Sequence, residues 1–331
     1  MRGRCVKRPW LKTTLVLVFL LTGAATVLAQ GGPPPGAGPP PGAGPGPPEF
    51  QLVSVSTTVN VDNLIFTPAT ATISVTVGHT GGPGAYVITV SRGSSATFDP
   101  REMQYQGSSG GLYGPLLYNI YTPDDEIARD LSGPVSNSEV ISGTFGNSGS
   151  SFNTRQHAFD VRIPAEQFVQ RGNYQDQVDV SLYEGRGLTA ESLTLVGRET
   201  VTLSSETPAV AQIGISGQDD YTMDFGILQT GASRTAELQY RTNAGFSIDA
   251  VSENNGVMVN TMQPQSDPVP YQLTVDGNPV DLSSSSVIGQ DLLFGTTIAF
   301  ESVPLSGTIG TIGQVLPGHF QDVITFTISN Y

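Results

Sequence analysis

The residues that could carry chemistry are few and lie far apart in the chain. The three histidines, His79, His157 and His319, share no spacing typical of a metal site, and the glycines beside His79 and His319 indicate turns. Carboxylates cluster at 124–126 and 219–220, where a catalytic pair or a Ca²⁺ site competes with a simpler interpretation, a solvated turn. We therefore expect no catalytic residue, no metal and no cofactor, and predict that the protein is not an enzyme.

Two glycine-rich segments, 107–111 and 143–146, contain the small residues that phosphate-binding loops use, but neither opens a helix. Glycine and serine cannot bury apolar neighbours locally, so we expect apolar residues in these loops to be exposed and to contact a ligand. For Tyr113 and Phe145 a second interpretation stays open, in which the ring folds back onto the core. The ligand-contact candidates are Leu112, Tyr113, Pro115 and Leu116 in one loop, and Phe145 and Phe152 in the other.

The elements that must position these residues are strands. Apolar and polar residues alternate in many short runs, such as 53–61 and 72–77, and Gly, Asn, Asp, Ser and Pro separate the runs. The Asp-Gly-Asn sequence at 276–278 predicts a tight hairpin turn. No amphipathic helix of useful length is evident, so we predict an all-β fold.

One short pattern occurs twice. Residues 172–176 read Gly-Asn-Tyr-Gln-Asp and residues 318–322 read Gly-His-Phe-Gln-Asp, and each copy leads into an alternating run. A turn residue, an aromatic, an acid and a period-2 run are typical of the corner into a late strand of a β-sandwich. Two copies about 146 residues apart predict two related domains.

The corner residues are expected to be structural. In immunoglobulin-like sandwiches a tyrosine at this place bonds back to the upstream backbone, which Tyr174 could do, whereas Phe320 has no hydroxyl and can only pack. The residues concerned are Gly172, Tyr174, Asp176, Gly318, Phe320 and Asp322.

The N-terminal residues have the composition of a secretory signal. A basic segment precedes the apolar stretch 13–27, and small residues follow before Gln30, so we expect cleavage after residue 29 rather than a retained membrane anchor. Residues 30–48 contain nine Pro and seven Gly without the collagen period, which predicts an extended spacer that cannot act as a β-strand. No further apolar run of spanning length follows, so the mature protein is expected not to be integral to a membrane.

Charge and cysteine content narrow the function classes. Of 15 basic residues, five lie in the predicted signal, which leaves ten arginines against 29 acidic residues and a net charge of −19. Such a surface repels nucleic acid and anionic lipid. The single cysteine, Cys5, lies in the signal, so the mature chain has no disulfide and depends on strand pairing and core burial.

Several motifs in order resemble the spore coat protein U domain family, whose members are subunits and tip adhesins of archaic chaperone–usher pili. The resemblance covers nearly all of residues 50–331. The matching segments are the Gly-x-Tyr-x-Asp corner at 172–176 and, with Phe, at 318–322, then 101–103, 117–122, 223–228, 242–246, 252–256 and 270–273.

The resemblance implies two immunoglobulin-like antiparallel β-sandwich (pilin-like) domains in tandem, at 49–205 and 206–331. Family domains lack their last strand, and an extension of a neighbouring subunit fills the open groove by strand addition. In the C-terminal domain the groove edge would be Val323, Ile324, Phe326, Ile328 and Tyr331.

The N-terminal domain ends differently, because two more alternating runs follow at 193–196 and 200–203. These could supply its missing strand within the same chain, or form an ordinary interdomain strand; in either case we expect 193–203 to pair within the N-terminal domain. Residues 53–61 could donate a strand to a neighbour but are more simply the first strand of this domain.

The function expected from the residues and the resemblance is that of a secreted pilus subunit, the tip adhesin of an archaic chaperone–usher fibre, which accepts a donor strand in its C-terminal domain. The implied partners are a periplasmic chaperone, an outer-membrane usher, a neighbouring pilin subunit and an apolar surface or host ligand. The protein would pass through the periplasm to the cell-surface fimbrium or the extracellular space. The alternative is a stand-alone spore-coat or extracellular-matrix protein without a dedicated ligand site.

Overall fold

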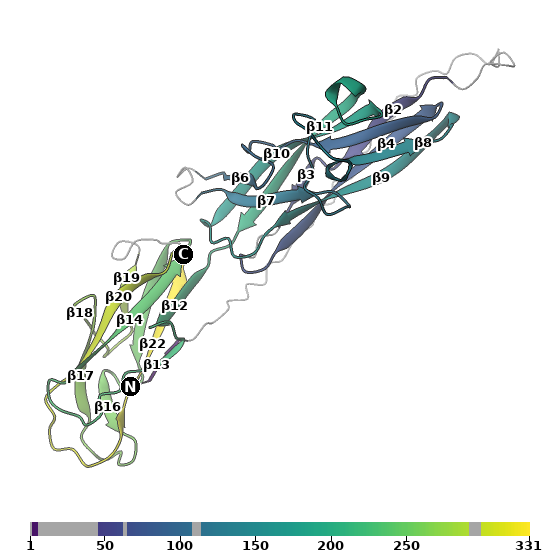
Figure 1. The fold of residues 1–331 in the computed structure, drawn as a ribbon. Coiled ribbons are helices and arrows are strands. Elements are labelled where there is room, and N and C mark those ends of the chain that lie inside the picture. The colour runs from purple at the N-terminus through teal and green to yellow at the C-terminus, as the bar shows by residue number, and fades with distance from the viewer. Residues whose placement is uncertain (1, 6–45, 62–64, 108–113, 291–298) are drawn as a thin grey trace.

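The computed structural model describes residues 2–5, 46–61, 65–107, 114–290 and 299–331, and nearly all regular structure in them is β (Figure 1). Two short 3₁₀ turns, η1 (Asn137–Glu139) and η2 (Ala190–Ser192), are the helical elements of this part of the chain. In the same residues no helix is long and apolar enough to cross a bilayer. The predicted all-β fold is confirmed.

A ten-stranded curled sheet makes up the N-terminal region. Its strands are β2 (Glu49–Val55), β3 (Thr58–Asn60), β4 (Ala69–Gly81), β5 (Gly84–Val90), β6 (Arg101–Tyr105), β7 (Leu116–Tyr121), β8 (Ile141–Phe145), β9 (Gly149–Ile163), β10 (Gly172–Gly185) and β11 (Leu193–Thr207).

The curl follows from the order of these strands, β2-β4-β9-β7-β6-β10-β11-β3, with β5 paired to β10 and β8 to β5. Strands β2 and β3 are neighbours in sequence yet lie at opposite ends of the order, so the sheet must bend round to bring its ends together. Along β4, Ile73, Val75 and Val77 are buried while Ser74 is exposed, which is the period-2 burial that the sequence predicts.

Strand β11 pairs within the N-terminal region, as predicted for residues 193–203. It runs antiparallel to β10 from Gly172 opposite Thr207 to Gly185 opposite Leu193, and β3 pairs with its other edge in parallel. The segment 53–61 likewise contributes to this region, with β2 paired to β4 and β3 to β11.

Two sheets form the C-terminal region and share one hydrophobic core. The seven-stranded sheet contains β12 (Ala211–Ile215), β14 (Ser233–Thr242), β16 (Val257–Asn260), β17 (Val269–Val275), β18 (Asn278–Val280), β20 (Glu301–Ile309) and β21 (Phe320–Gln321). The five-stranded sheet has the order β13 (Asp220–Thr222), β1 (Arg2–Cys5), β22 (Val323–Asn330), β15 (Phe246–Ser252) and β19 (Ser286–Gln290).

The predicted hairpin turn at 276–278 is confirmed, because Val275 pairs with Asn278 between β17 and β18. Asp276 and Gly277 both have positive φ, at 50° and 75°, as a two-residue hairpin turn requires.

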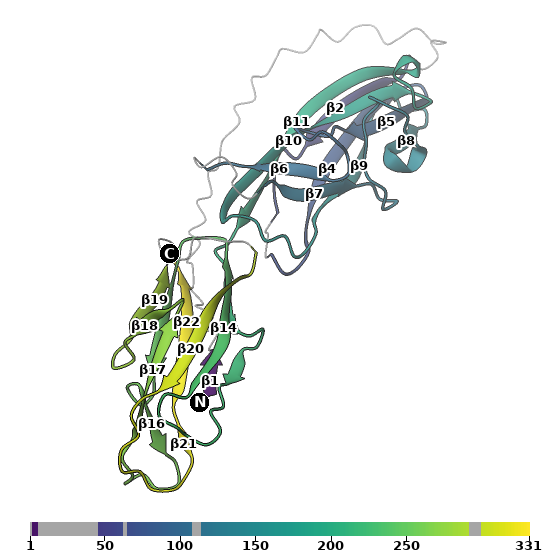
Figure 2. The same ribbon diagram turned by 60° about the vertical axis from the view of Figure 1, so that its left-hand side comes forward.

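The two regions lie end to end (Figures 1 and 2). The buried side chain of Asn243 joins them. Its Nδ2 donates to the carbonyl oxygens of Val169 (3.0 Å) and Pro208 (2.9 Å), and its Oδ1 accepts from the amide of Val210 at 2.7 Å. The amide of Arg171 donates to the Asn243 carbonyl at 2.9 Å. We call this set of contacts the junction. The two large hydrophobic cores on either side of it share no residue.

Candidate functional site

The first corner places Asp176 at the centre of a buried hydrogen-bond network. Its carboxylate accepts from the Tyr118 hydroxyl at 2.6 Å, from the Ser94 hydroxyl at 2.7 Å and from the Ser94 amide at 3.0 Å. Burial, followed by the negative charge of Asp176, raises the pKa of Tyr118 well above its usual range, so the phenol stays protonated and donates. The corner ties β10 to two segments far away in the sequence.

The second corner repeats this geometry with other residues. The Asp322 carboxylate accepts from the Tyr271 hydroxyl at 2.5 Å, from the Ser252 hydroxyl at 2.6 Å and from the Asn254 amide at 3.1 Å. Burial and the bond to Asp322 raise the pKa of Tyr271 well above its usual range. The acid of the repeat therefore has the same structural role in both regions: it accepts hydrogen bonds from a tyrosine hydroxyl, a serine hydroxyl and a backbone amide.

The aromatic position of the repeat differs between the copies. The Tyr174 hydroxyl donates to the carbonyl oxygen of Gln170 at 2.9 Å, the bond expected of a tyrosine corner. Phe320 is half-buried and packs against the C-terminal core. Gly172 has a φ of 138°, which favours glycine over residues with a side chain. A Cβ at Gly318 would lie 2.3 Å from Oδ1 of Asn260, so packing requires a glycine there.

The edge of β22 forms the most distinctive feature of the C-terminal region. On one side β22 pairs with β15, from Phe246 opposite Asn330 to Ser252 opposite Ile324. On the other side it pairs in parallel with β1, and β1 in turn pairs with β13. In the described residues β13 and β22 are thus held apart by four residues from the opposite end of the chain. We call the space between β13 and β22 the slot.

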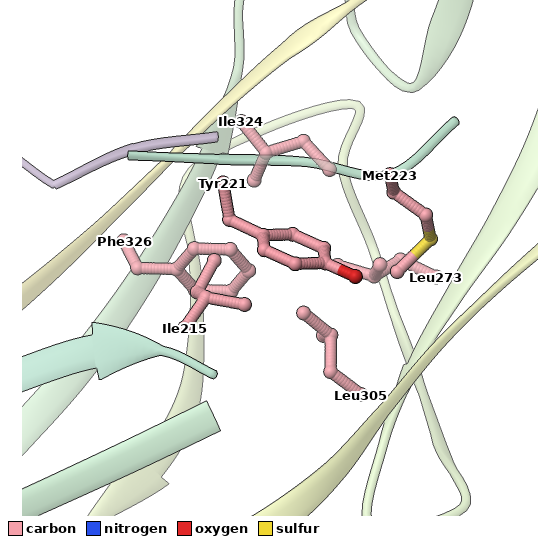
Figure 3. Close-up of a pocket in the computed structure, with 7 residues that line it drawn as sticks. All are labelled: Ile215, Tyr221, Met223, Leu273, Leu305, Ile324 and Phe326. Atoms are coloured by element: carbon pink, nitrogen blue, oxygen red, sulfur yellow. The ribbon is translucent and has the colours of Figure 1, made fainter. Parts of the chain in front are cut away.

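The floor of the slot is apolar (Figure 3). Seven side chains point toward one another around a void of about 20 Å³. They are Ile215, Tyr221, Met223, Leu273, Leu305, Ile324 and Phe326. Because no charged residue lines it, a void of this kind stays dry and is filled best by apolar side chains.

The predicted groove residues divide between several places. Ile324 and Phe326 line the void, Val323 pairs with Arg2 at the strand edge, and Ile328 is half-buried against the core. Tyr331 lies beyond the end of β22, at the junction, where its carbonyl accepts from Nη1 of Arg171 at 3.2 Å. Tyr331 does not line the void.

Two of the loop residues expected to be exposed are buried. Leu116 is 0% exposed because it opens β7, where Tyr118 and Ile120 follow it into the core with the period of a strand. Phe145 is 6% exposed because it stacks on His79, with ring centroids 4.8 Å apart. The expectation of exposure is wrong for Leu116, and for Phe145 the second interpretation, a ring folded back onto the core, is the one observed. Leu112 and Tyr113 lie outside the described residues, and Pro115 is half-buried.

The two candidate loops also lie at opposite ends of the N-terminal region, not at one end. Tyr105, which precedes the first loop, pairs with Tyr174 at the start of β10, whereas Gly84, opposite Phe145, lies near the other end of β10. The eleven residues from Tyr174 to Glu184 span about 33 Å in a strand. The two loops therefore cannot form one contact surface.

Phe152 is exposed, as expected, and it forms a small apolar patch with a residue that sequence reasoning did not single out. The Phe152 ring and Val53 both lie over Gly78, where an added Cβ would be 2.3 Å from the ring and 2.8 Å from Val53. Phe152 is 53% and Val53 42% exposed. We call Val53, Gly78 and Phe152 the distal patch, because it lies at the end of the region farther from the junction.

Two of the three histidines, His79 and His157, have side-chain partners in the described residues. His79 is buried in β4, not in a turn as expected, and Nδ1 lies 2.9 Å from the Ser148 hydroxyl. His157 Nε2 lies 2.8 Å from the Tyr86 hydroxyl, and burial followed by the charge of Arg155 lowers the pKa of His157. His319 is exposed outside any strand. No group of three or more metal-ligating side chains occurs among the described residues.

Comparison with protein-family models and with curated proteins finds no match. Among solved structures, a chain of the CsuC–CsuE chaperone–tip adhesion subunit complex from archaic chaperone–usher Csu pili of Acinetobacter baumannii is 13% identical, covers 86% of this chain and 100% of its own, and gives a TM-score of 0.47. The CupB6 tip adhesin from Pseudomonas aeruginosa is 11% identical over 86% of this chain and 98% of its own, with a TM-score of 0.33.

CfaE, the adhesive subunit of CFA/I fimbria of enterotoxigenic Escherichia coli, is 9% identical over 83% of this chain and 99% of its own, with a TM-score of 0.32. Because these identities are 13% or less, we base the function on strand pairing and side-chain geometry.

Proposed function

We propose that this protein is a surface pilus subunit whose C-terminal region is completed by a strand from a partner. The observation that carries the proposal is the slot. An extended segment four residues long pairs there with β13 on one side and β22 on the other, above an apolar floor. Backbone hydrogen bonds on both edges and pockets for alternate side chains are the two requirements of strand addition.

The segment in the slot is Arg2–Cys5, which belongs to the predicted secretory signal. If residues 1–29 are removed on export, β13 and β22 lose the strand between them, and their inner backbone groups and the apolar floor become exposed. The mature protein would then need a replacement strand. By the sequence resemblance, the replacement comes first from a periplasmic chaperone and then from a neighbouring subunit, with an outer-membrane usher as the assembly site.

The N-terminal region fits the role of an adhesin. Its strand β11 is already paired along β10, so this region has a complete edge there and needs no donor. The distal patch offers Phe152 and Val53 to an apolar partner, since exposed apolar clusters mark contact sites. We propose an apolar surface as the target, because the strongly acidic chain repels anionic ones.

The test of the strand-accepting role uses the chain without residues 1–29. We expect it to aggregate when refolded alone, and to become a soluble monomer with a synthetic alternating apolar peptide, with slow amide exchange along β22. Tyr221→Ser, which removes a ring from the slot, should weaken peptide binding, whereas Thr222→Ser on the exposed face of the same strand should not. A soluble chain with protected β22 amides and no peptide would contradict the proposal and favour a stand-alone coat or matrix protein.

The adhesive role has a separate test. Replacing Val53 and Phe152 together by Ser should reduce retention on a hydrophobic surface by tenfold or more, because it removes the exposed apolar area of the patch. The matched control is Ile227→Ser, which removes an exposed apolar side chain from the C-terminal region. Equal retention of both variants and the unmodified chain would place adhesion elsewhere.

A further inference from the structure

The first half of strand β9 is paired along one edge only. Strand β4 lies beside this half, and the register between the two strands is continuous from Asn153 to Ala158 (Figure 1). On the other side of β9, strand β7 pairs with residues 160–162, and no strand of the described residues pairs with β9 before them. We call the unpaired side of Phe152–Ala158 the free edge.

The free edge presents backbone groups that a further strand can use. In a strand, the N–H and C=O of one residue point to one side and those of the next residue point to the other, so about half of these groups in Phe152–Ala158 point away from β4. The amide of Ser151 donates to the Ser148 carbonyl at 2.9 Å in the hairpin turn, which marks where the free edge begins. An edge of this kind is a template for pairing with another chain.

The devices that commonly block such an edge do not occur in it. Lysine, proline and bulges serve this purpose in many sheets. Residues 152–158 read Phe-Asn-Thr-Arg-Gln-His-Ala, with neither lysine nor proline, and no register shift interrupts the pairing with β4 from Asn153 onward. The free edge is therefore open to strand addition.

The distribution of charge favours a second copy of this chain as the partner. The chain has 29 acidic residues, yet β4 and residues 149–159 contain none, and Arg155 is the charged residue of these segments at neutral pH. Two copies of an acidic protein repel each other over most of their surfaces. Along these two strands they can meet without carboxylates lying opposite each other.

Inward side chains hold the free edge in place. The guanidinium carbon of Arg155 lies 5.1 Å from the centre of the Phe145 ring, and Nε2 of His157 lies 2.8 Å from the Tyr86 hydroxyl. Phe145 and Tyr86 belong to β8 and β5, which pair with each other and not with β9. Because these contacts already fix the strand, a partner does not have to order it on binding.

We propose that two copies of this chain associate by antiparallel pairing of their free edges about a twofold axis. The axis is perpendicular to the sheet, so the same edge of each copy contacts the other and the two sheets become continuous. The proposal goes beyond the pilus role and does not depend on the slot or on adhesion by the distal patch.

Arg155 selects the register of this pairing. Residues opposite each other must point to the same face, so the possible registers place one residue on the axis opposite its own copy. With Arg155 on the axis two guanidinium groups face each other, and with Gln156 on the axis Arg155 faces the basic His157. With Thr154 on the axis Arg155 faces Asn153. Like charges directly opposite destabilise a pair, and a shift the other way runs into the hairpin turn, so Thr154 lies on the axis.

This register leaves the outer faces of both copies accessible. Phe152 of one copy lies opposite Gln156 of the other, and Phe152, Thr154 and Gln156 are all exposed in the single chain. The distal patches of the two copies then lie on the same face of the continuous sheet, because rotation about an axis perpendicular to the sheet preserves its faces.

The experiment is sedimentation velocity on the full chain over a range of concentrations up to about 1 mM, where an interface with a Kd of 1 mM is substantially occupied. We expect a monomer–dimer equilibrium. Thr154→Lys should raise its Kd about fivefold or more, because two lysines would lie directly opposite each other. The matched control is Thr72→Lys, the same substitution at an exposed position of β4, and its Kd should stay unchanged.

A mixture of two variants tests the register itself. Thr154→Lys and Thr154→Glu should each associate weakly alone, whereas their equimolar mixture should form a heterodimer, because lysine then faces glutamate across the axis. Hydrogen exchange of the unmodified chain at low and high concentration should show slower exchange of amides in Phe152–Ala158 when the dimer forms. Circular dichroism of each variant checks that the fold persists.

Four results would each overturn the proposal. The first is a chain that stays monomeric at about 1 mM. The second is an equal effect of Thr154→Lys and Thr72→Lys, which would place the interface elsewhere. The third is a mixture that associates no better than either variant alone. The fourth is a chain that stays monomeric while a synthetic peptide of residues 149–158 slows amide exchange in β9, since the free edge would then serve a different extended polypeptide.

Discussion

Asp176 and Asp322 are buried carboxylates that each accept a tyrosine hydroxyl, a serine hydroxyl and a turn amide. A buried charge is tolerated when such bonds replace its hydration, and removing it leaves several buried donors without an acceptor. The acid of the repeat is thus a structural anchor of the strand that follows it, in both regions.

Replacing Asp322 by Ala should lower the free energy of unfolding by about 2–4 kcal/mol, because the donors from Tyr271, Ser252 and Asn254 lose their acceptor. Urea denaturation of the full chain measures the change. Asp267→Ala, at an exposed position, is the control and should stay within about 0.5 kcal/mol of the unmodified chain. Equal losses in the two variants would argue against the anchor role.

Alkaline pH should destabilise the N-terminal region through Tyr174. Burial, and then the neighbouring Tyr105, raises the pKa of Tyr174 to about 12 from 10.0, so the folded state holds the phenol proton more tightly than the unfolded state. This stabilisation is complete below pH 10 and is lost as pH rises toward 12, an effect of at most about 2–3 kcal/mol.

Denaturation at several pH values between 8 and 12 checks this expectation. Tyr174→Phe should show a shallower loss of stability above pH 10, since Phe has no proton to lose, as at Phe320 in the second corner. A pH profile unchanged by the substitution would be inconsistent with titration of Tyr174.

The sequence pattern predicts which residues form the corners but not what they bind. The Gly-x-Tyr-x-Asp spacing places Tyr174 and Asp176 on one face of a strand, and both are buried. Tyr118 and Ser94, however, lie 58 and 82 residues away from Asp176, so only the tertiary fold brings them to it.

At the scale of strands, Gly78 determines how Phe152 is presented. The ring lies over the glycine, where an added Cβ would be 2.3 Å away. Gly78→Val should push the ring off the strand, and because Phe152 is at the surface the fold should persist, with adhesion to a hydrophobic surface reduced about threefold to tenfold. Adhesion assays with thermal unfolding as the stability check measure both effects.

The control for this substitution is Gly146→Val, at a glycine of the neighbouring hairpin where no atom lies within 4 Å of an added Cβ and no positive φ is recorded. Adhesion that falls equally in both variants would mean that Gly78 has no special role in the distal patch.

The alternation of apolar and polar residues predicted most strands, including β11. It could not predict which strands pair or where each strand begins. The burial of Leu116 follows from its place at the start of β7, a strand that begins inside the segment expected to be a loop. The burial of Phe145 follows from contacts with His79, Phe50 and Tyr86, which come from other strands. Register and partner choice, which set both outcomes, are properties of paired strands and not of single segments.

For the whole molecule, Asn243 is the residue that couples the two regions. Asn243→Ala would leave the carbonyls of Val169 and Pro208 and the amide of Val210 without their partner. We expect a loss of about 2–4 kcal/mol at the junction and faster protease cleavage within residues 206–211, with the two cores intact. Limited proteolysis with mass spectrometry measures the rate and place of cleavage. Asn137→Ala, at an exposed position, is the control. Unchanged cleavage would show that the junction does not depend on this side chain.

The long pairing of β10 with β11 has a mechanical consequence for a molecule held at the distal patch and pulled from its C-terminal region. Tension would then act along these strands, whose ladder extends from Gly172–Thr207 beside the junction to Gly185–Leu193 at the far end. Antiparallel hydrogen bonds lie perpendicular to the strands, so a load along the strands shears many bonds together and does not open them one after another. Resistance to such a load is set by the rate of barrier crossing during unfolding and not by equilibrium stability, so a marginally stable adhesive chain can still hold under brief, strong pulling.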